Sequence, residues 1–413
     1  MRPSPALLVA ILVVVTAPPA AVATPALAAG DGGTYQITPV NGTTNQLSIP
    51  ESEVRTAAFT SPDVEVGTAV AAGSRQLHQE HETQAFEERF IRADSQRARA
   101  VLVDDRLDAI EERRLELERQ QRDALAAASD SRSVAEFVTV RALVDAEARS
   151  LADGLRRIER TDRNNPDFSL GRERRTELEN TKGNLRMLTG PVATQLGRSL
   201  SGQSTSGPVY FETATDGYTL AFVTESEYVR ETHLDDQRSP GATDQFAESE
   251  GDRLRNAADR AESLYPWLYD RQLPSVQSFG GTNIYQLTAD HSDGRLTAYL
   301  DGGSTQVFRE IQYRQLSTVE PTASETTVEE SVRLTVNRAY ETGPLRVVVA
   351  SNETGAPIEG TVAVSGQRVG ETGADGTLWT VEPRGAYNVT VTTADGTELE
   401  VERTELDVDS SVQ

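Results

Sequence analysis

The stretch VYFETATDGYTLAFV, residues 209–223, recurs as IYQLTADHSDGRLTAYL at residues 284–300, with a two-residue insertion. In each copy, alternating apolar and polar residues flank an Asp-Gly pair, which is typical of two β-strands joined by a tight turn. A third strand-like segment follows each hairpin, and the tetrapeptide YVRE at 228–231 resembles VFRE at 307–310. Because a helical segment precedes each meander, the sequence predicts a duplicated α-β-β-β unit with an antiparallel sheet over residues 208–315.

Residues 74–200 have helical spacing instead. From Ser74 to Ala128 the chain contains neither Gly nor Pro and is rich in Glu, Arg, Gln, Ala and Leu, which all favour helix. Apolar side chains recur there every three or four residues, as in a coiled coil. After a short break, a capping box from Ser133 to Glu136 opens a second amphipathic segment. We therefore expect a long, coiled-coil-like antiparallel helical hairpin or bundle in this region.

The remaining segments complete a multidomain α+β protein. Residues 30–73 are rich in Gly, Thr and Pro, with a few alternating apolar positions, and predict an irregular or short-strand lead-in. Residues 316–331 are rich in Thr, Glu and Ser, the composition of a flexible linker. Between residues 332 and 406, short alternating segments are separated by Gly, Pro and Asp-Gly, which predicts a small immunoglobulin-like β-sandwich. A polar tail at 407–413 ends the chain.

The second copy of the repeat resembles the PepSY family, whose repeats place a sheet after a helix. Its strands typically show a leading Tyr, an Asp-Gly turn, a Val-Tyr-Val-Asp strand, a Thr-Gly turn and a closing Val-Leu pair. The matching residues here are Tyr285, Asp293, Gly294, Tyr299, Leu300, Asp301, Val307 and Phe308, while Ser304 and Thr305 depart from the Thr-Gly turn. The resemblance implies an extracellular or envelope module that restrains peptidases, and it brings no catalytic residues.

The C-terminal segment resembles the carboxypeptidase-regulatory-like, immunoglobulin-like surface modules. These share a Gly-x-Pro-x-x-Gly motif, a valine-rich strand, an Asp-Gly turn and a closing Pro-x-Gly-x-Tyr-x-Val-Thr-Val strand. The residues that carry the resemblance are Gly355, Pro357, Gly360, Asp375, Gly376, Pro383, Gly385, Tyr387, Val389, Thr390 and Val391. The resemblance implies an adhesive or presenting domain and does not set a function.

Composition excludes several classes of function. The chain has 413 residues, 64 Asp and Glu against 40 Lys and Arg, and a formal charge of −24, which repels nucleic acid and anionic lipid. It has no cysteine, so disulfides, thiol catalysis and zinc-thiolate sites are excluded. Lys182 is its single lysine. An acidic surface with almost no lysine suits molar salt, which screens the self-repulsion, so we expect a halophile of haloarchaeal type.

The N-terminal residues 1–29 have the order of a secretory signal peptide. Arg2 precedes the apolar run from Ala6 to Ala17, and two prolines and small-residue cleavage motifs follow. Three cleavage points stay open, after Ala23, Ala28 or Ala29. No later stretch is apolar enough to cross a bilayer. We therefore expect an exported mature chain with no integral membrane span, located extracellularly or in the cell envelope.

Candidate chemical sites are few. Asn41, Asn352 and Asn388 begin Asn-X-Thr sequons and are candidates for glycosylation. His78 and His81 lie three residues apart on one predicted helix face and are weak candidates for metal ligands, because a solvated helical turn is the favoured explanation of this pair. No nucleophile elbow, P-loop or dinucleotide-binding glycine motif occurs. We expect no catalytic residue and no cofactor.

Three functional hypotheses follow. The first is a non-enzymatic scaffold or binding protein of the envelope, whose partner is a protein or peptide. A free strand edge in the meander would accept a peptide by β-addition. The second, from the PepSY resemblance, is an inhibitor or chaperone of a secreted peptidase. The third is a hydrolase with an unrecognised site. A homodimer through the helical hairpin stays open, because the apolar seam is interrupted.

Overall fold

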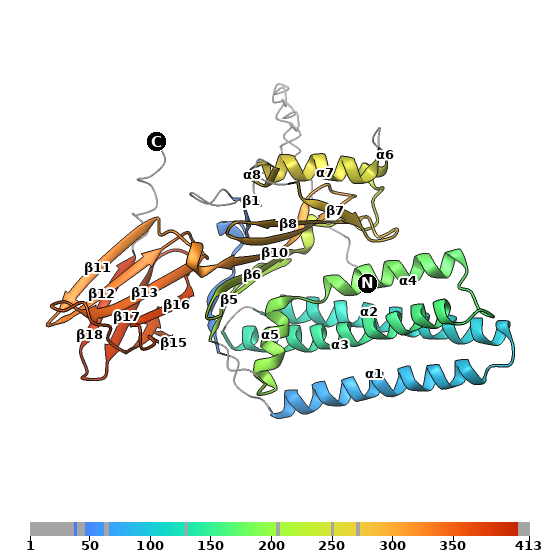
Figure 1. Ribbon diagram of the computed structural model, residues 1–413, viewed down its shortest axis with the longest axis horizontal. Helices are drawn as coiled ribbons and strands as arrows, with labels where there is room; N and C mark the ends of the chain where they lie inside the picture. The colour runs from blue at the N-terminus through green and yellow to red at the C-terminus, as the bar shows by residue number, and fades with distance from the viewer. Residues whose placement is uncertain are drawn as a thin grey trace, which may run out of the picture.

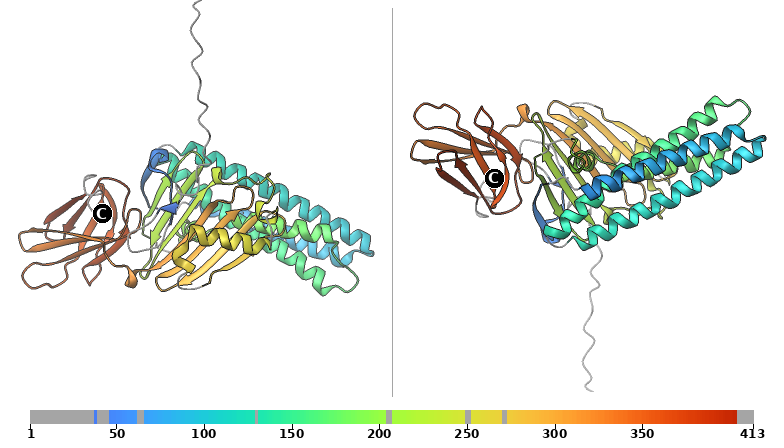
Figure 2. Two further views of the ribbon diagram at one scale, coloured as in Figure 1. Left: turned by 90° about the horizontal axis from the view of Figure 1, so that it is seen from above. Right: turned by 90° about the horizontal axis from the view of Figure 1, so that it is seen from below.

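The computed structural model describes residues 37–38, 46–61, 66–128, 131–203, 207–248, 252–269 and 273–403. The predicted signal peptide, the tail at 407–413 and Asn41 lie outside these residues. The described chain is an elongated α+β protein in which an antiparallel sheet stands between a helical bundle and a C-terminal β-sandwich (Figures 1 and 2). None of its described helices is both long and apolar enough to cross a membrane.

The bundle is built from α1 (Val66–Arg92), α2 (Gln96–Ala127), α3 (Ser131–Asn164), α4 (Arg172–Met187) and α5 (Pro191–Leu200). Phe86 and Phe90 of α1 share one apolar core with residues of α2, α3 and α4.

The single helix expected from Ser74 to Ala128 is wrong, because Ser95 divides it into α1 and α2. The Oγ atom of Ser95 accepts a hydrogen bond from the backbone N–H of Ala98 at 3.2 Å and caps the second helix. Since the helix propensity is high on both sides of Ser95, only this cap marks the break. The predicted hairpin or bundle is therefore a bundle, in which α1, α2 and α3 are the three long helices.

The central sheet has eight strands. In chain order they are β3 (Thr56–Thr60), β4 (Val209–Thr213), β5 (Gly217–Val223), β6 (Glu227–Leu234), β7 (Ser275–Ser278), β8 (Ile284–His291), β9 (Gly294–Asp301) and β10 (Val307–Gln315). Across the sheet the order is β3-β4-β5-β6-β10-β9-β8-β7. The two predicted meanders are therefore halves of one sheet, joined through their third strands.

The join between β6 and β10 is nearly symmetric. An approximate twofold axis passes through the pair formed by Glu231 and Ile311. This axis exchanges the two flanking pairs, Thr232 with Glu310 and Arg230 with Gln312. The strand part of the predicted repeat is thus present.

This axis does not map the tetrapeptide YVRE onto VFRE residue by residue, because β10 contains a bulge. The register of β10 against β9 shifts between Val307 and Arg309. A bulge adds one residue and turns the side chains after it to the other face. Phe308 and Arg309 consequently both contact the helical bundle, and Glu310 takes the position equivalent to Arg230.

The two faces of the sheet have different covers. Helices α3 and α5 pack on one face of the first meander, against residues such as Phe211 and Val229. On the other face, α6 (Gln245–Glu248), α7 (Arg253–Leu264) and α8 (Pro266–Tyr269) cover the second meander (Figure 1). The helix before each meander therefore lies on a different face, so the repeat is symmetric in its strands only.

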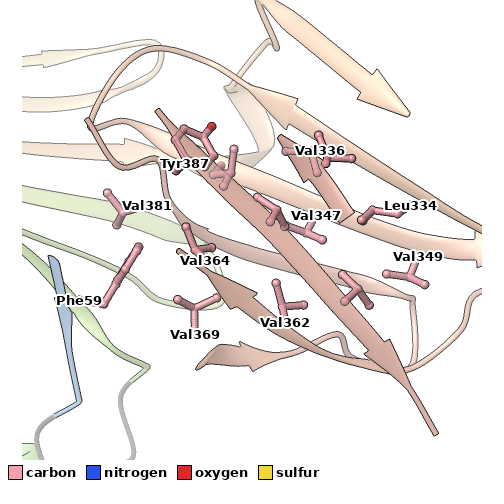
Figure 3. Packing of buried hydrophobic residues seen from close by; sticks show 14 of the residues in the cluster. Phe59, Leu334, Val336, Val347, Val349, Val362, Val364, Val369, Val381 and Tyr387 are labelled. Atoms are coloured by element: carbon pink, nitrogen blue, oxygen red, sulfur yellow. The ribbon is translucent and has the colours of Figure 1, made fainter. Parts of the chain in front are cut away.

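The C-terminal sandwich consists of two four-stranded sheets. One contains β11 (Ala323–Glu329), β12 (Val332–Arg338), β13 (Pro344–Ser351) and β16 (Thr377–Val381). The other contains β15 (Gln367–Glu371), β14 (Gly360–Val364), β17 (Tyr387–Thr393) and β18 (Glu398–Arg403). Figure 3 shows the valine-rich core between them, with Phe59 of β3 beside Val369 and Val381 at its edge.

The linker expected at 316–331 is wrong, because Ala323–Glu329 forms strand β11 and a short 3-10 helix occupies Leu316–Thr318. Strand β11 pairs with β12 along its whole length. It is an edge strand with half-exposed or exposed side chains, so Thr and Val suit it without a run of large apolar residues. Its polar composition therefore looked like a linker.

Glu382, between β16 and β17, gives a pH-dependent stability. Burial raises its pKa from 4.5 to about 7, although Arg403 and Tyr387 donate hydrogen bonds to its carboxylate. The folded state therefore holds a proton that the unfolded chain has lost, and the free energy of unfolding falls as pH rises through this window. In the wild type the free energy of unfolding should fall by up to about 1.4 kcal/mol per pH unit between pH 5 and 7. We predict that Glu382→Gln removes this pH dependence.

Denaturant unfolding of wild type and variant at fixed salt measures this difference. Glu371→Gln, at an exposed carboxylate paired with Arg368 on the same sandwich, is the matched control and should change stability equally at both pH values. Parallel pH profiles for wild type and Glu382→Gln would contradict the assignment.

Candidate functional site

The central strands β6 and β10 carry ionisable side chains into the interior on both faces of the sheet. On the bundle face, Glu231 of β6 accepts hydrogen bonds from Arg141 of α3 at 2.9 Å and from Arg309 of β10 at 3.0 Å. All three side chains are 0% exposed. Burial opposes ionisation of Glu231, but the two guanidinium groups hold its pKa below the usual value. We call these three residues the Glu231 cluster.

The Glu231 cluster also holds the end of α4. Arg309 donates to the carbonyl oxygens of Arg186 at 2.9 Å and Met187 at 3.1 Å, and Arg141 donates to that of Leu188 at 2.8 Å. The last carbonyls of a helix lack partners within the helix and carry partial negative charge, so cations are favourable there. The cluster therefore joins α3, α4 and the sheet.

Gly190 shows how closely the backbone approaches this cluster. A Cβ atom at position 190 would lie 2.0 Å from Oε2 of Glu231, which is far closer than atoms can approach. The backbone N–H of Gly190 is bonded to Asp145 of α3 at 2.7 Å. Only glycine therefore allows the turn between α4 and α5 to pass over the carboxylate.

On the opposite face, Glu310 and Arg230 hold the lead-in. Glu310 accepts hydrogen bonds from the backbone N–H of Leu47 at 3.0 Å and from the hydroxyl group of Tyr265, and Arg230 donates to the carbonyl of Leu47 at 2.6 Å. Burial raises the pKa of Glu310. The side chains of Leu47 and Ile49 are buried with those of α7. Residues 46–49 of the predicted lead-in are therefore part of the core, and Gln46–Leu47 forms the short strand β2.

Arg384 connects the sandwich to the sheet. It lies in the turn between β16 and β17, and its guanidinium donates to Glu212 of β4 at 2.8 and 3.2 Å. It also donates to the carbonyl of Ile49 at 3.3 Å, and its backbone N–H donates to the hydroxyl group of Tyr210. Glu212 is fully buried, so this ion pair lies inside the interface between sandwich and sheet.

A cavity with both polar and apolar lining lies beside the Glu231 cluster. Its volume is about 230 Å³, and α2, the end of α4 and the segment after β6 enclose it. Its lining residues are Glu118, Gln121, Arg122, Leu125, Met187, Leu188, His233, Asp235, Arg238 and Pro240. His233 stacks on Tyr218 at 5.6 Å between ring centroids, and its Nε2 lies 3.6 Å from Asp235. Burial lowers the pKa of His233.

The candidate residues from the sequence lie apart from these clusters. His78 and His81 are on the exposed side of α1, and within the described ranges no group of three or more His, Cys, Asp or Glu is placed to hold a metal ion. Asn352 lies in an exposed turn after β13. Asn388 lies within β17, half-buried, and its side-chain amide donates to Glu400. Glycosylation of these residues stays a prediction.

Comparisons with known proteins match three successive segments of the chain. Residues 1–205 match a domain of unknown function (DUF7096), and residues 209–320 match a family of unknown function (DUF7094). Residues 323–404, which begin with β11, match an archaeal fibronectin-III type-like domain. The C-terminal sandwich is fibronectin-III-like. No curated protein and no solved structure matches the chain.

These matches correct the two resemblances drawn from sequence. The sandwich is similar to the archaeal fibronectin-III type, not to the carboxypeptidase-regulatory-like modules. Both are small sandwiches with the same turn residues, because Gly, Pro and Asp-Gly mark turns in either fold. The repeat matches the family of unknown function at residues 209–320 and not PepSY. The strand motifs quoted for PepSY describe hairpins and turns and do not distinguish one meander from another.

The sequence reasoning missed the residues of the buried clusters. Arg230 and Glu231 are adjacent in β6, so one of them faces each side of the sheet, a pattern usually read as an exposed strand. A weak signal was available, since apolar Tyr228 and Val229 directly precede them. Helices and a sandwich from distant parts of the chain cover both faces of β6. The burial of its charged residues could therefore not be predicted from the strand alone.

We predict that Glu231→Gln destabilises the protein by about 3–5 kcal/mol, because removing one partner leaves two buried guanidinium groups without a counter-charge. Equilibrium unfolding in denaturant measures the change. Glu177→Gln is the matched control, since it breaks a partly exposed pair with Arg174 on α4 and should cost about 0–1 kcal/mol. Equal effects of the two substitutions would show that the Glu231 cluster does not hold the bundle on the sheet.

Proposed function

We propose that this chain is an exported, non-enzymatic scaffold protein that presents its helical bundle and its fibronectin-III-like sandwich at a fixed orientation to a protein or peptide of the cell envelope. The observation that carries the proposal is the pair of buried ionic contacts on the central sheet, where Glu231 holds the bundle and Glu212 holds the sandwich. The pairs of Glu231 are buried in both partners, and that of Glu212 is buried on the side of the carboxylate, so each favours one geometry between the parts that it joins.

Export and a salt-rich environment are parts of the same proposal. They are supported by the signal-peptide pattern of residues 1–29 and by the net charge of −24 with a single lysine. The fibronectin-III-like match supports a structural or binding role for the sandwich. The proposal assigns no catalytic step, because the buried carboxylates Glu231, Glu212 and Glu310 are engaged by neighbouring side chains or backbone groups.

We predict that Arg384→Gln frees the sandwich from the sheet, because it removes the charged hydrogen bonds to Glu212. Small-angle X-ray scattering of the full mature chain in high salt should then show a broader distribution of interatomic distances than wild type. Arg368→Gln is the control, since Arg368 makes an exposed pair with Glu371 within the sandwich. An unchanged distribution for Arg384→Gln would overturn the rigid-scaffold proposal. Crosslinking in native salt, followed by mass spectrometry, would identify the partner.

A second candidate function is peptide binding by β-addition, including restraint of a secreted peptidase. The outer strands of the two meanders are not free, because β3 pairs with β4 and β7 pairs with β8. The edges of the sheet are therefore β3 and β7. At β3, the side chain of Gln367 already accepts the N–H of Phe59 at 2.9 Å. Directly after β7, the backbone N–H of Phe279 donates to the carbonyl oxygen of Ile284 in β8. Because successive N–H groups of a strand point to opposite sides, the N–H of Ser278 points away from β8 and out of the sheet. Strand β7 is therefore the edge that favours this function.

We predict that, if β7 accepts an extended peptide, the full mature chain slows a secreted protease in high salt and Ser278→Pro abolishes the effect. Proline removes the outward N–H of an edge strand and leaves the pairing to β8 in place. Ser278→Ala keeps the N–H and is the control. No inhibition at micromolar wild-type protein, or inhibition that survives Ser278→Pro, would exclude this mode.

A further inference from the structure

Helix α1 carries large apolar side chains on the face that points away from the bundle. Val70, Leu77 and Ile91 are 66%, 73% and 77% exposed. The opposite face of the same helix buries Phe86 and Phe90 against α2, α3 and α4. Figure 1 shows α1 at the outer margin of the bundle, where no other described element covers its outer face. The helix is therefore apolar on two sides, and the described chain uses only one of them.

The exposed apolar residues are aligned rather than scattered. Leu77 follows Val70 by seven residues and Ile91 follows Leu77 by fourteen, with the exposed Gln84 halfway between. Seven residues make nearly two full turns, so all four side chains lie along one line of the helix. We call Val70, Leu77, Gln84 and Ile91 the α1 stripe. Single exposed apolar residues need no explanation, but a seven-residue repeat is the pattern along which a second helix packs.

The α1 stripe is complementary to a second copy of itself in the antiparallel direction. A twofold axis midway between positions 80 and 81 places Val70 opposite Ile91 of the second copy and Leu77 opposite Gln84. Both ends of the contact are then apolar pairs, and the methylene groups of Gln84 pack on Leu77 near the centre. An isologous contact of this kind uses the same surface on both copies.

The charges of α1 favour the same direction. Residues 66–79 contain no Asp or Glu and one arginine, whereas residues 80–92 contain four Glu against two Arg. In an antiparallel pair, the acidic half of each helix lies beside the acid-free half of the other. A parallel pair would place the two acidic halves side by side, and like charges across a contact are unfavourable.

The distribution of charge along the chain also favours the bundle as the place where two copies meet. Residues 66–200 carry 24 Asp and Glu against 23 Lys and Arg, whereas residues 201–413 carry 35 against 15. The acidity of the protein therefore lies in the sheet and the sandwich, and the bundle is almost neutral. Two copies repel each other least when they approach through their bundles.

We propose that the α1 stripe is an interface for a second copy of this chain, and that the two α1 helices pack antiparallel. A helix of 27 residues is about 40 Å long, so the contact is one helix pair and is smaller than an obligate dimer interface. The dimer is therefore a reversible one in which both sandwiches stay free. This interface goes beyond the scaffold role and does not depend on it.

Sedimentation equilibrium of the full mature chain at constant high salt tests the interface. We expect a monomer–dimer equilibrium across the micromolar range, and Leu77→Gln should weaken the dimer by about tenfold or more, because each copy loses a central apolar contact. Leu77 is exposed in the monomer, so this substitution leaves the core of the bundle unchanged. Leu115→Gln, at an exposed leucine of α2, is the matched control and should leave the equilibrium unchanged. A monomer at every concentration, or equal effects of the two substitutions, would overturn the proposal.

Crosslinking tests the direction of packing. The chain has no cysteine, so an introduced thiol is its only one. Val70→Cys and isotopically labelled Ile91→Cys are mixed and treated with a short bismaleimide, and mass spectrometry separates the products. Antiparallel packing predicts crosslinks between the two variants and few within either variant alone. Faster crosslinking of Val70→Cys to itself would contradict the antiparallel arrangement, and the scattering result for Arg384→Gln would stand unaffected.

Discussion

The architecture depends on a single buried carboxylate, that of Glu231, at the centre of the sheet. Arg141 comes from 90 residues earlier in the chain and Arg309 from 78 residues later, and both direct a guanidinium group at it. Without the carboxylate, two cations would be buried together, and without the arginines, the carboxylate would be desolvated without a partner. The same arginines satisfy the last carbonyls of α4, so the strand pair, the bundle and the turn at Gly190 are mutually dependent.

The bulge in β10 explains why the two halves of a nearly symmetric sheet differ. One extra residue turns Arg309 toward the helices and Glu310 toward α7, so the Arg-Glu pair of β10 is inverted relative to that of β6. On the bundle face, Arg309 thereby joins Arg141 of α3 around one carboxylate, and on the opposite face Glu310 joins Arg230 of β6 in holding the backbone of Leu47. A repeated strand pattern was thus adapted to two unlike neighbours, a bundle on one side and a lead-in with α7 on the other.

Much of the fold could be predicted from local patterns. The Asp-Gly pairs predict the hairpins, the Gly- and Pro-free run from Ser74 to Ala128 predicts helix, and the alternating valines predict the sandwich. The errors arose where local composition is ambiguous. Ser95 breaks a run whose propensity is uniformly helical, and β11 uses Thr and Glu that also suit a linker, because an exposed edge strand needs few apolar residues. The buried ion pairs could not be predicted, since a charged residue shows its burial only when its distant cover is known.

The sequence by itself determined the elements, the repeat, the acidic surface and the lack of thiol chemistry, because each of these follows from residue type and short-range spacing. Only the tertiary structure decided which charges are surface and which are structural. Among 104 charged residues, buried ones such as Glu231, Glu212 and Glu310 differ from those at the surface in position rather than in type. Their desolvation and their arginine or backbone partners come from segments far apart in the chain. The cavity at His233 and Arg238 arises for the same reason, where α2, α4 and β6 meet.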